Sequence, residues 1–117
     1  MPELFKLIKE EFSKIDNEWQ WTYQCLFEFT FKKRAIKEIT ITDHWKKKLG
    51  RGTITKEFIL ELLTKMNGEN LEPMEYEGKR EPYEWEVIYD EKPYILFFWF
   101  DDYNPHGLWI RNCHRIN

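Results

Sequence analysis

Residues 18–31 read EWQWTYQCLFEFTF, and this stretch decides much of the fold. Every odd position carries an aromatic ring or a thiol, whereas the even positions are mostly polar. Successive side chains of a β-strand point to opposite faces, so this alternation predicts one long, half-buried strand. An aromatic stripe for stacking bases would need the same rings exposed, and so large an apolar patch is uncommon on a soluble monomer. We therefore assign the odd face to the core.

The segments on either side of residues 18–31 favour a helix and a second strand. Upstream, apolar side chains recur at helical spacing across residues 3–15, and Pro2 suits a helix start. Downstream, residues 36–42 read IKEITIT and place isoleucines on one face of a strand. The two strands are expected to form an antiparallel hairpin.

Two short helices are expected after the hairpin. Asp43 can cap a helix over 44–49 through its carboxylate. Thr55 can cap a second helix, which ends at Asn67–Gly68. The buried stripe of this second helix recurs at helical spacing: Phe58, Ile59, Leu62, Leu63 and Met66.

Three further strands are expected at 83–89, 94–100 and 108–116. In the first, Glu84 and Glu86 alternate with inward-facing aromatic side chains. The second, YILFFWF, is apolar on both faces, which is typical of a central strand. On the third, the even residues are assigned to the core face: Leu108, Ile110, Asn112, His114 and Ile116. The odd residues are left on an open sheet face: Trp109, Arg111, Cys113 and Arg115.

The expected element order is α-β-β-α-α-β-β-β, and the length of 117 residues favours one domain, residues 1–117. This order predicts an α+β fold: an N-terminal helix and two further helices packed on one face of a mainly antiparallel sheet of about five strands. The most apolar run, 94–100, is too short to span a membrane, and no secretory signal is recognisable. Two cysteines are unremarkable in a cytosolic protein, so we expect free thiols and a cytoplasmic location.

Charge is strongly segregated along the chain. Residues 32–51 contain 8 basic and 2 acidic residues, a net +6, within a chain of net charge −3, so the remainder carries −9. A local cationic patch steers an anion more than the total charge does. We therefore predict RNA-binding roles for the basic residues Lys33, Arg34, Lys46, Lys47 and Lys48. The alternative is a solvated basic face that offsets the acidic one.

Residues 44–51 also include a candidate catalytic group. On a helix, His44 and Arg51 would share one face with two lysines. Nearby cations lower the pKa of a histidine and favour the neutral form that a general base requires. The alternative is a surface histidine on a solubilising helix.

The last strands add further catalytic candidates. Glu86 or His44 could remove the proton of an RNA 2′-hydroxyl. Arg111 and Arg115 could then stabilise the pentacoordinate phosphorane. His114 is the candidate acid for the leaving 5′-oxygen if the last strand bends. The alternative is ordinary cross-strand charge pairing on a solvated sheet face.

We expect no metal or other cofactor. A zinc site built from Cys25, His106, Cys113 and His114 lacks the usual ligand spacings, and neighbouring strand residues point to opposite faces. The sequence also contains no Gly-rich phosphate loop and no nucleophile-elbow motif.

From residue 39 onward, the layout resembles the RelE-like toxins, ribonucleases with a barnase/RelE-type fold. The resemblance rests on ITITDHWKKKLGRGTITKEFILELL, YEWEVIY, KPYILFFWF and LWIRNCHRI. It places His44 after the first strand, Arg51 before the helix start ITKE, and Arg115 in the last strand. It implies a metal-independent endoribonuclease that cleaves mRNA or tRNA and is held inactive by a cognate inhibitor protein.

Two other functions are compatible with the same residues. One is a non-catalytic module of the same fold that contacts nucleic acid or a partner protein through residues 32–51. The other is an interaction or inhibitor domain that presents its acidic residues 69–91 to a basic partner.

Overall fold

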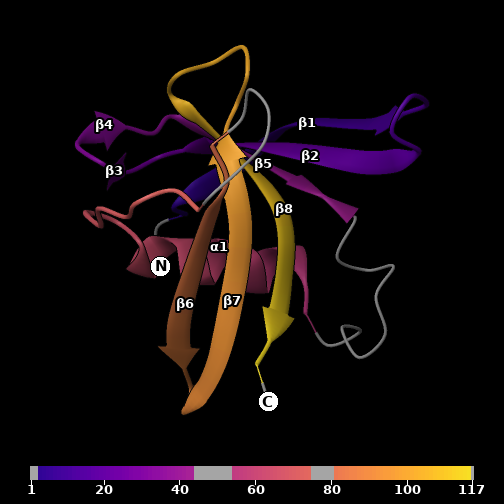
Figure 1. Ribbon diagram of the computed structural model, residues 1–117. Coiled ribbons are helices and arrows are strands. Elements are labelled where there is room, and N and C mark those ends of the chain that lie inside the picture. The colour runs from indigo at the N-terminus through magenta and orange to yellow at the C-terminus, as the bar shows by residue number, and fades with distance from the viewer. Residues whose placement is uncertain (1–2, 44–53, 75–80, 117) are drawn as a thin grey trace.

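The computed structural model describes residues 3–43, 54–74 and 81–116, and within these ranges it is mostly β-structure with one helix (Figure 1). Six strands form one sheet in the order β1-β2-β5-β8-β7-β6, and β3 and β4 form a separate hairpin. The strands are β1 (Phe5–Ser13), β2 (Glu18–Cys25), β3 (Thr30–Phe31), β4 (Arg34–Ala35), β5 (Glu38–Thr42), β6 (Tyr83–Tyr89), β7 (Lys92–Phe100) and β8 (Gly107–Arg115). The helix α1 (Lys56–Lys65) crosses one face of the sheet, here called the helix-side face, and we call the other the open face.

The prediction of an α+β fold with three helices is wrong, because residues 3–15 do not form a helix. They contain β1, which pairs with β2 along its whole length. The register of this pairing shifts between Leu7 and Lys9, and such a bulge moves the following side chains to the other face. Apolar spacing across a bulged strand therefore imitates the period of a helix. The helix expected over 44–49 lies outside the described residues.

The aromatic stretch 18–31 forms two strands rather than one continuous strand. β2 ends at Cys25 and pairs with β5 as the predicted antiparallel hairpin, while Thr30 begins β3. Four of its odd residues are buried, as predicted: Trp21, Tyr23, Phe29 and Phe31. Trp19, near the tip of the β1–β2 hairpin, is 42% exposed.

The helix α1 begins and ends where its capping residues predict. The Thr55 side chain accepts a hydrogen bond of 3.1 Å from the Phe58 backbone N–H, and Gly68 follows the last turn with a φ of 86°. Its buried side chains face the sheet: Ile59, Leu60, Leu62 and Leu63. Full burial of such a side chain contributes about 1.5–3 kcal/mol to folding. Among the described residues, no helix is long and apolar enough to cross a membrane.

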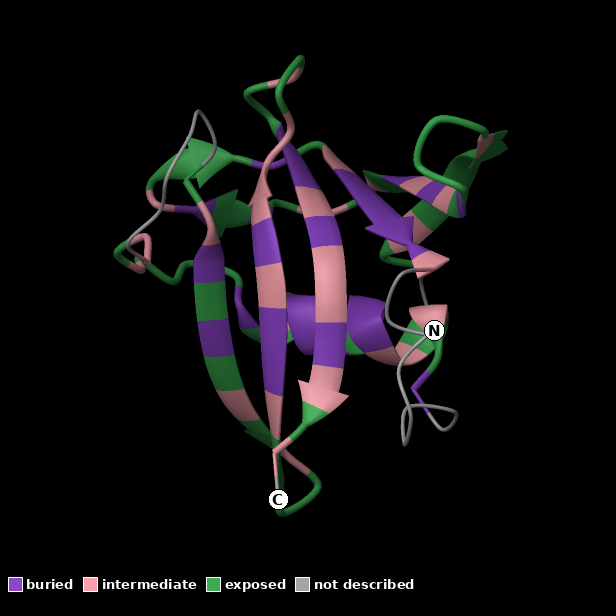
Figure 2. Ribbon diagram, turned by 45° about the vertical axis from the view of Figure 1, so that its right-hand side comes forward, coloured by how far each residue is buried: buried purple, intermediate pink, exposed green. Residues whose placement is uncertain are grey.

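The three C-terminal strands form as predicted, but the faces of β8 change partway along it. Figure 2 shows the alternation of buried and exposed residues on β6, where Glu84 and Glu86 are exposed. Residues 97 and 98 of β7 pair with residues 112 and 110, so Arg111 is an extra residue in β8. Beyond this bulge Cys113 is buried, and His114 lies on the open face. The assignment of Asn112 and His114 to the core face is therefore wrong.

Candidate functional site

A short charged hairpin stands beside the sheet. β3 and β4 contain two residues each and are joined by Lys32 and Lys33, whose φ angles are 54° and 63°. Positive φ at both positions defines a type I′ turn, which favours Asn and Gly, and each such residue costs about 1 kcal/mol or more when it is a lysine. Contacts outside the two strand pairs must therefore hold this turn.

Those contacts come from the end of α1 and from the core. The Asn67 side-chain oxygen accepts a hydrogen bond of 2.9 Å from the Thr30 N–H, and the Lys32 N–H donates to the Glu69 carbonyl at 3.0 Å. Phe31 is fully buried and meets three aromatic rings with centroids 5.3 to 5.8 Å away: Tyr83, Phe98 and Phe100. The segment that ends the helix thus also positions the hairpin.

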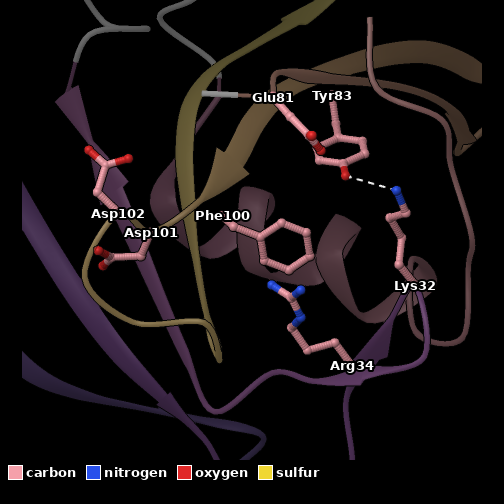
Figure 3. A pocket seen from close by; sticks show the side chains of 7 residues that line it. All are labelled: Lys32, Arg34, Glu81, Tyr83, Phe100, Asp101 and Asp102. Atoms are coloured by element: carbon pink, nitrogen blue, oxygen red, sulfur yellow. Dashed lines mark hydrogen bonds between the residues drawn. The ribbon is translucent and has the colours of Figure 1, made fainter. Parts of the chain in front are cut away.

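The hairpin forms one wall of a pocket of about 410 Å³ (Figure 3). The lining residues come from the hairpin, the start of β6, and the end of β7 with the loop after it: Lys32, Arg34, Glu81, Tyr83, Phe100, Asp101 and Asp102. In Figure 3 the Phe100 ring lies between the two cations on one side and the two aspartates on the other. The volume falls in the range of small-molecule sites.

Aromatic side chains hold the two cations in place. Lys32 Nζ donates a hydrogen bond of 3.0 Å to the Tyr83 hydroxyl, and this bond raises the pKa of Lys32. The guanidinium carbon of Arg34 lies 4.3 Å from the centre of the Phe100 ring, and one of its N–H groups donates to the Pro105 carbonyl at 3.4 Å. A guanidinium stacked on a ring still directs its N–H donors outward in its own plane. Both side chains are therefore charged at neutral pH and oriented by their contacts.

The opposite wall is a loop, residues 101–106, that is tied to the hairpin. Nδ1 of His106 donates a hydrogen bond of 2.9 Å to the Ala35 carbonyl. Within the loop, the Asp101 carboxylate accepts a hydrogen bond of 2.9 Å from the Tyr103 N–H. These bonds set the spacing between the cations and the carboxylates before any ligand arrives.

The pocket carries opposite charges on its two sides. Lys32 and Arg34 provide two positive charges on one side, where Glu81 also lies beside Tyr83, and Asp101 and Asp102 provide carboxylates on the other side of Phe100. A compact anion such as inorganic phosphate would be attracted by the first group and repelled by the second. A ligand that keeps an anionic group apart from hydrogen-bond donors satisfies both.

The catalytic candidates Glu86 and His114 share a row across the open face. Ile95 pairs with Glu86 on one side and with His114 on the other. Two strand spacings, about 10 Å, therefore separate the backbones of Glu86 and His114. The His114 ring stacks on Phe97 with a centroid distance of 5.8 Å.

The two arginines of β8 do not join Glu86 and His114. Arg111 donates to both carboxylate oxygens of Glu18, at 3.1 and 3.0 Å. Burial raises the pKa of Glu18, while the charge of Arg111 opposes that increase. Arg115 pairs with Tyr94 at the end of β8, where it is exposed on the helix-side face.

Several sequence-predicted site residues lie outside the described part of the chain: His44, Lys46, Lys47, Lys48 and Arg51. Of the other two predicted RNA-binding residues, Arg34 lines the pocket and Lys33 is exposed in the turn. Within the described ranges, no group of three histidine, cysteine, aspartate or glutamate side chains could hold a metal ion.

Sequence reasoning missed the aromatic and acidic parts of the pocket. Tyr83 is predicted only as one of the inward-facing aromatic residues of strand 83–89, and no role is predicted for Asp101 or Asp102, which lie between the strands 94–100 and 108–116. Lys32 stands in the basic segment, but only the structure shows that it reaches Tyr83. A sequence signal existed in the charge of residues 32–34, yet it does not indicate which loop the hairpin meets.

Comparison with family models, with curated proteins and with solved structures gives no match for this chain. The resemblance to RelE-like toxins therefore stays a prediction.

Proposed function

We propose that this protein binds single-stranded RNA and seats one nucleotide in the pocket between the β3–β4 hairpin and loop 101–106. The observation that supports this most is the separation of charge in the pocket, with Lys32 and Arg34 on one side of Phe100 and Asp101 and Asp102 on the other. A nucleotide has the same polarity, because its phosphodiester is anionic and its base carries N–H donors.

Each part of the nucleotide has a counterpart in the pocket. The phosphate oxygens accept hydrogen bonds from Lys32 and Arg34, which their aromatic contacts hold in position. The base edge reaches the carboxylates of Asp101 and Asp102. A carboxylate accepts two adjacent donors at once, and guanine presents two adjacent N–H donors on its Watson–Crick edge. We therefore expect guanine to bind more tightly than the other bases.

The binding test uses fluorescence anisotropy with a labelled, unstructured RNA of about ten nucleotides and two charge-matched variants. Arg34→Gln removes a charge from the pocket, whereas Lys92→Gln removes one from the first residue of β7, at the far end of the sheet. Loss of a charge-assisted hydrogen bond of about 1.5 kcal/mol weakens binding roughly tenfold. We expect that loss for Arg34→Gln and almost no change for Lys92→Gln. Equal losses in both variants, or no binding by the unaltered chain, would rule out the proposed site.

Salt dependence gives a second measure of the same contact. The logarithm of the binding constant for a single strand falls with the logarithm of salt concentration by about 0.7 per neutralised phosphate. Arg34→Gln should reduce this slope by about one such contact, and Lys92→Gln should leave it unchanged. A slope that is the same in the chain and both variants would mean that Arg34 does not contact phosphate.

Base preference is tested with oligonucleotides that differ only at one central base. Asp101→Asn replaces a pure acceptor with a side chain that also donates, while it keeps the shape. We expect the preference for guanine to disappear in Asp101→Asn while binding of the other RNAs is retained or strengthened. Equal affinity for all four bases in the unaltered chain would contradict the role of the carboxylates but not the RNA-binding function.

RNA cleavage is the second candidate function, and the common row of Glu86 and His114 favours it. Glu86 would remove the 2′-hydroxyl proton and His114 would protonate the leaving 5′-oxygen. Incubation with RNA should then yield 2′,3′-cyclic phosphate ends, and Glu86→Gln should slow the reaction by about 10²-fold or more. An unaltered chain that binds RNA but yields no such ends would leave binding as the function.

Cys25 and Cys113 are both thiols, which suits the reducing cytoplasm that we propose as the location.

A further inference from the structure

The sheet ends on one side in β1, an edge strand whose nine residues are almost all exposed. Within the described ranges, β1 pairs only with β2, so the backbone groups on its outer side have no strand partner. Figure 1 shows the β1–β2 hairpin extending past the end of α1. A long edge strand of this kind is a template for pairing with another strand.

Exposed apolar side chains concentrate in the same hairpin. Nine large hydrophobic residues are exposed in the described part of the chain. Six of them lie in or beside β1 and at the start of β2: Leu4, Leu7, Ile8, Phe12, Ile15 and Trp19. Contiguous exposed apolar surface marks an interaction site more often than scattered residues do.

The backbone directions of β1 follow from its pairing with β2. The Leu4 carbonyl accepts a hydrogen bond of 2.8 Å from the Leu26 N–H, so Leu4 and Lys6 direct their backbone groups toward β2. Because the direction alternates along an antiparallel strand, Phe5 and Leu7 direct theirs outward.

The bulge in β1 changes which residues face outward. The register shift between Leu7 and Lys9 places one extra residue there, so the alternation restarts. After it, Lys9 and Glu11 direct their backbone groups toward β2, whereas Glu10 and Phe12 direct theirs outward.

A two-fold axis that passes between Ile8 and Lys9 would generate a second copy of β1 alongside the first. The outward residues of one copy would then lie opposite the outward residues of the other. The matched pairs are Phe5 with Phe12 and Leu7 with Glu10. In a strand without a bulge, residues 5 and 12 would face opposite sides of the sheet and could not pair about such an axis. The bulge therefore makes this edge complementary to itself.

The charges along β1 fit the same pairing. In the register set by Phe5 and Phe12, Lys6 lies opposite Glu11 and, beyond the strand ends, Glu3 lies opposite Lys14. Each pair occurs twice in a symmetric dimer, and opposite charges directly across an antiparallel pair are stabilising.

We infer that the protein forms a symmetric homodimer in which the β1 strands of two copies pair antiparallel and join their sheets into one. The inference stands on the edge strand and is independent of the RNA pocket, which lies at the β3–β4 hairpin. It explains why this edge carries apolar residues and a charge gradient along one strand, whereas β6 at the opposite edge exposes Glu84 and Glu86.

The test is sedimentation velocity of the full chain from about 1 to 100 µM, with circular dichroism to confirm folding. The chain should approach twice its mass of 14.6 kDa as concentration rises. Lys6→Glu places like charges opposite each other twice and should weaken association about tenfold. The double variant Lys6→Glu with Glu11→Lys restores opposite charges and should recover most of that affinity. Lys92→Glu, at the first residue of β7 and remote from β1, should leave the dimer unchanged.

A backbone variant tests the same interface without charge. Glu10→Pro removes an N–H that points away from β2, so the hairpin keeps its internal hydrogen bonds while the dimer loses one at each symmetric position. We expect a folded monomer. A chain that stays monomeric at 100 µM overturns the inference, and so does a dimer that neither Lys6→Glu nor Glu10→Pro weakens.

Discussion

Two hairpin turns in this molecule share a backbone conformation but are held in different ways. Lys32–Lys33 and Asp90–Glu91 both have positive φ at the two central positions, 54° and 63° in the first turn and 51° and 63° in the second. The second turn joins β6 and β7, which pair at seven positions, so its ladder supports it. The first joins strands that pair at only two positions, and it depends on Phe31, Asn67 and the loop opposite.

This difference shows what distinguishes a candidate site from a strained turn. Strain is common to both turns, so strain alone does not indicate function. The Lys32 turn is also fixed to the core through Tyr83, and Lys32 and Arg34 line a pocket that Asp101 and Asp102 line as well. The Asp90 turn is also tied to the helix, because the Tyr89 ring before it meets Phe58 at 5.3 Å and lies 5.4 Å from Lys65 Nζ. Neither Asp90 nor Glu91 lines the pocket, so this turn serves as an internal control for RNA binding.

The largest predicted effect comes from a variant that removes the buried ring anchoring the first turn. Phe31→Ala removes a fully buried ring that meets three aromatic neighbours, and truncation of this kind costs about 3–5 kcal/mol. Ile88→Ala, beside the second turn, removes a side chain that is 73% exposed and should cost about 0.5 kcal/mol or less. Urea unfolding of the two variants measures both costs, and similar values would contradict the contrast between the turns.

The next effect comes from relieving the strain in each turn separately. Asn-Gly in place of Asp90–Glu91 should stabilise the fold by about 1 kcal/mol, because these residues adopt positive φ readily. The same replacement at Lys32–Lys33 should gain less, because it also removes the hydrogen bond to Tyr83, worth about 1 kcal/mol. Of the two replacements, only the one at Lys32–Lys33 should weaken RNA binding. Equal gains with unchanged RNA affinity would show that Lys32 contributes neither to stability nor to the site.

The smallest predicted effect is a loss of stability at alkaline pH that arises from Lys32 in the first turn. The Tyr83 hydrogen bond raises the pKa of Lys32, so the folded state favours charged Lys32 more than the unfolded state does. Its contribution is therefore complete below the ordinary lysine pKa of about 10.5 and is lost as pH rises through the raised value. The difference in unfolding free energy between the chain and Lys32→Met should be constant up to about pH 10 and shrink above it. A difference that stays constant up to pH 11.5 would contradict the assigned role of this bond.

Regular segments of the fold could be predicted from the sequence alone. β6 alternates without interruption from Tyr83 to Tyr89, and α1 carries its cap at Thr55 and its stop at Asn67–Gly68. In such segments local periodicity and capping chemistry determine both the type of element and its buried face.

Two of the errors in the predicted fold have one physical cause. The bulge near Ile8 made a strand look like a helix, and the bulge at Arg111 moved His114 from the predicted core face to the open face. A bulge depends on how two strands pair, and a single strand's sequence does not contain that information. The same limit applies to the pocket, where charge indicated Arg34 but only tertiary contacts bring it opposite Asp101.

The most direct test of the proposed site compares the two turns during one titration. Backbone amide NMR of the full chain, with added guanosine-containing single-stranded RNA, reports where binding occurs. The largest shifts should fall on Lys32, Arg34 and Asp101, while Asp90 and Glu91 stay unchanged. Shifts confined to the open face around Glu86 and His114, or spread equally over both turns, would contradict binding in the pocket.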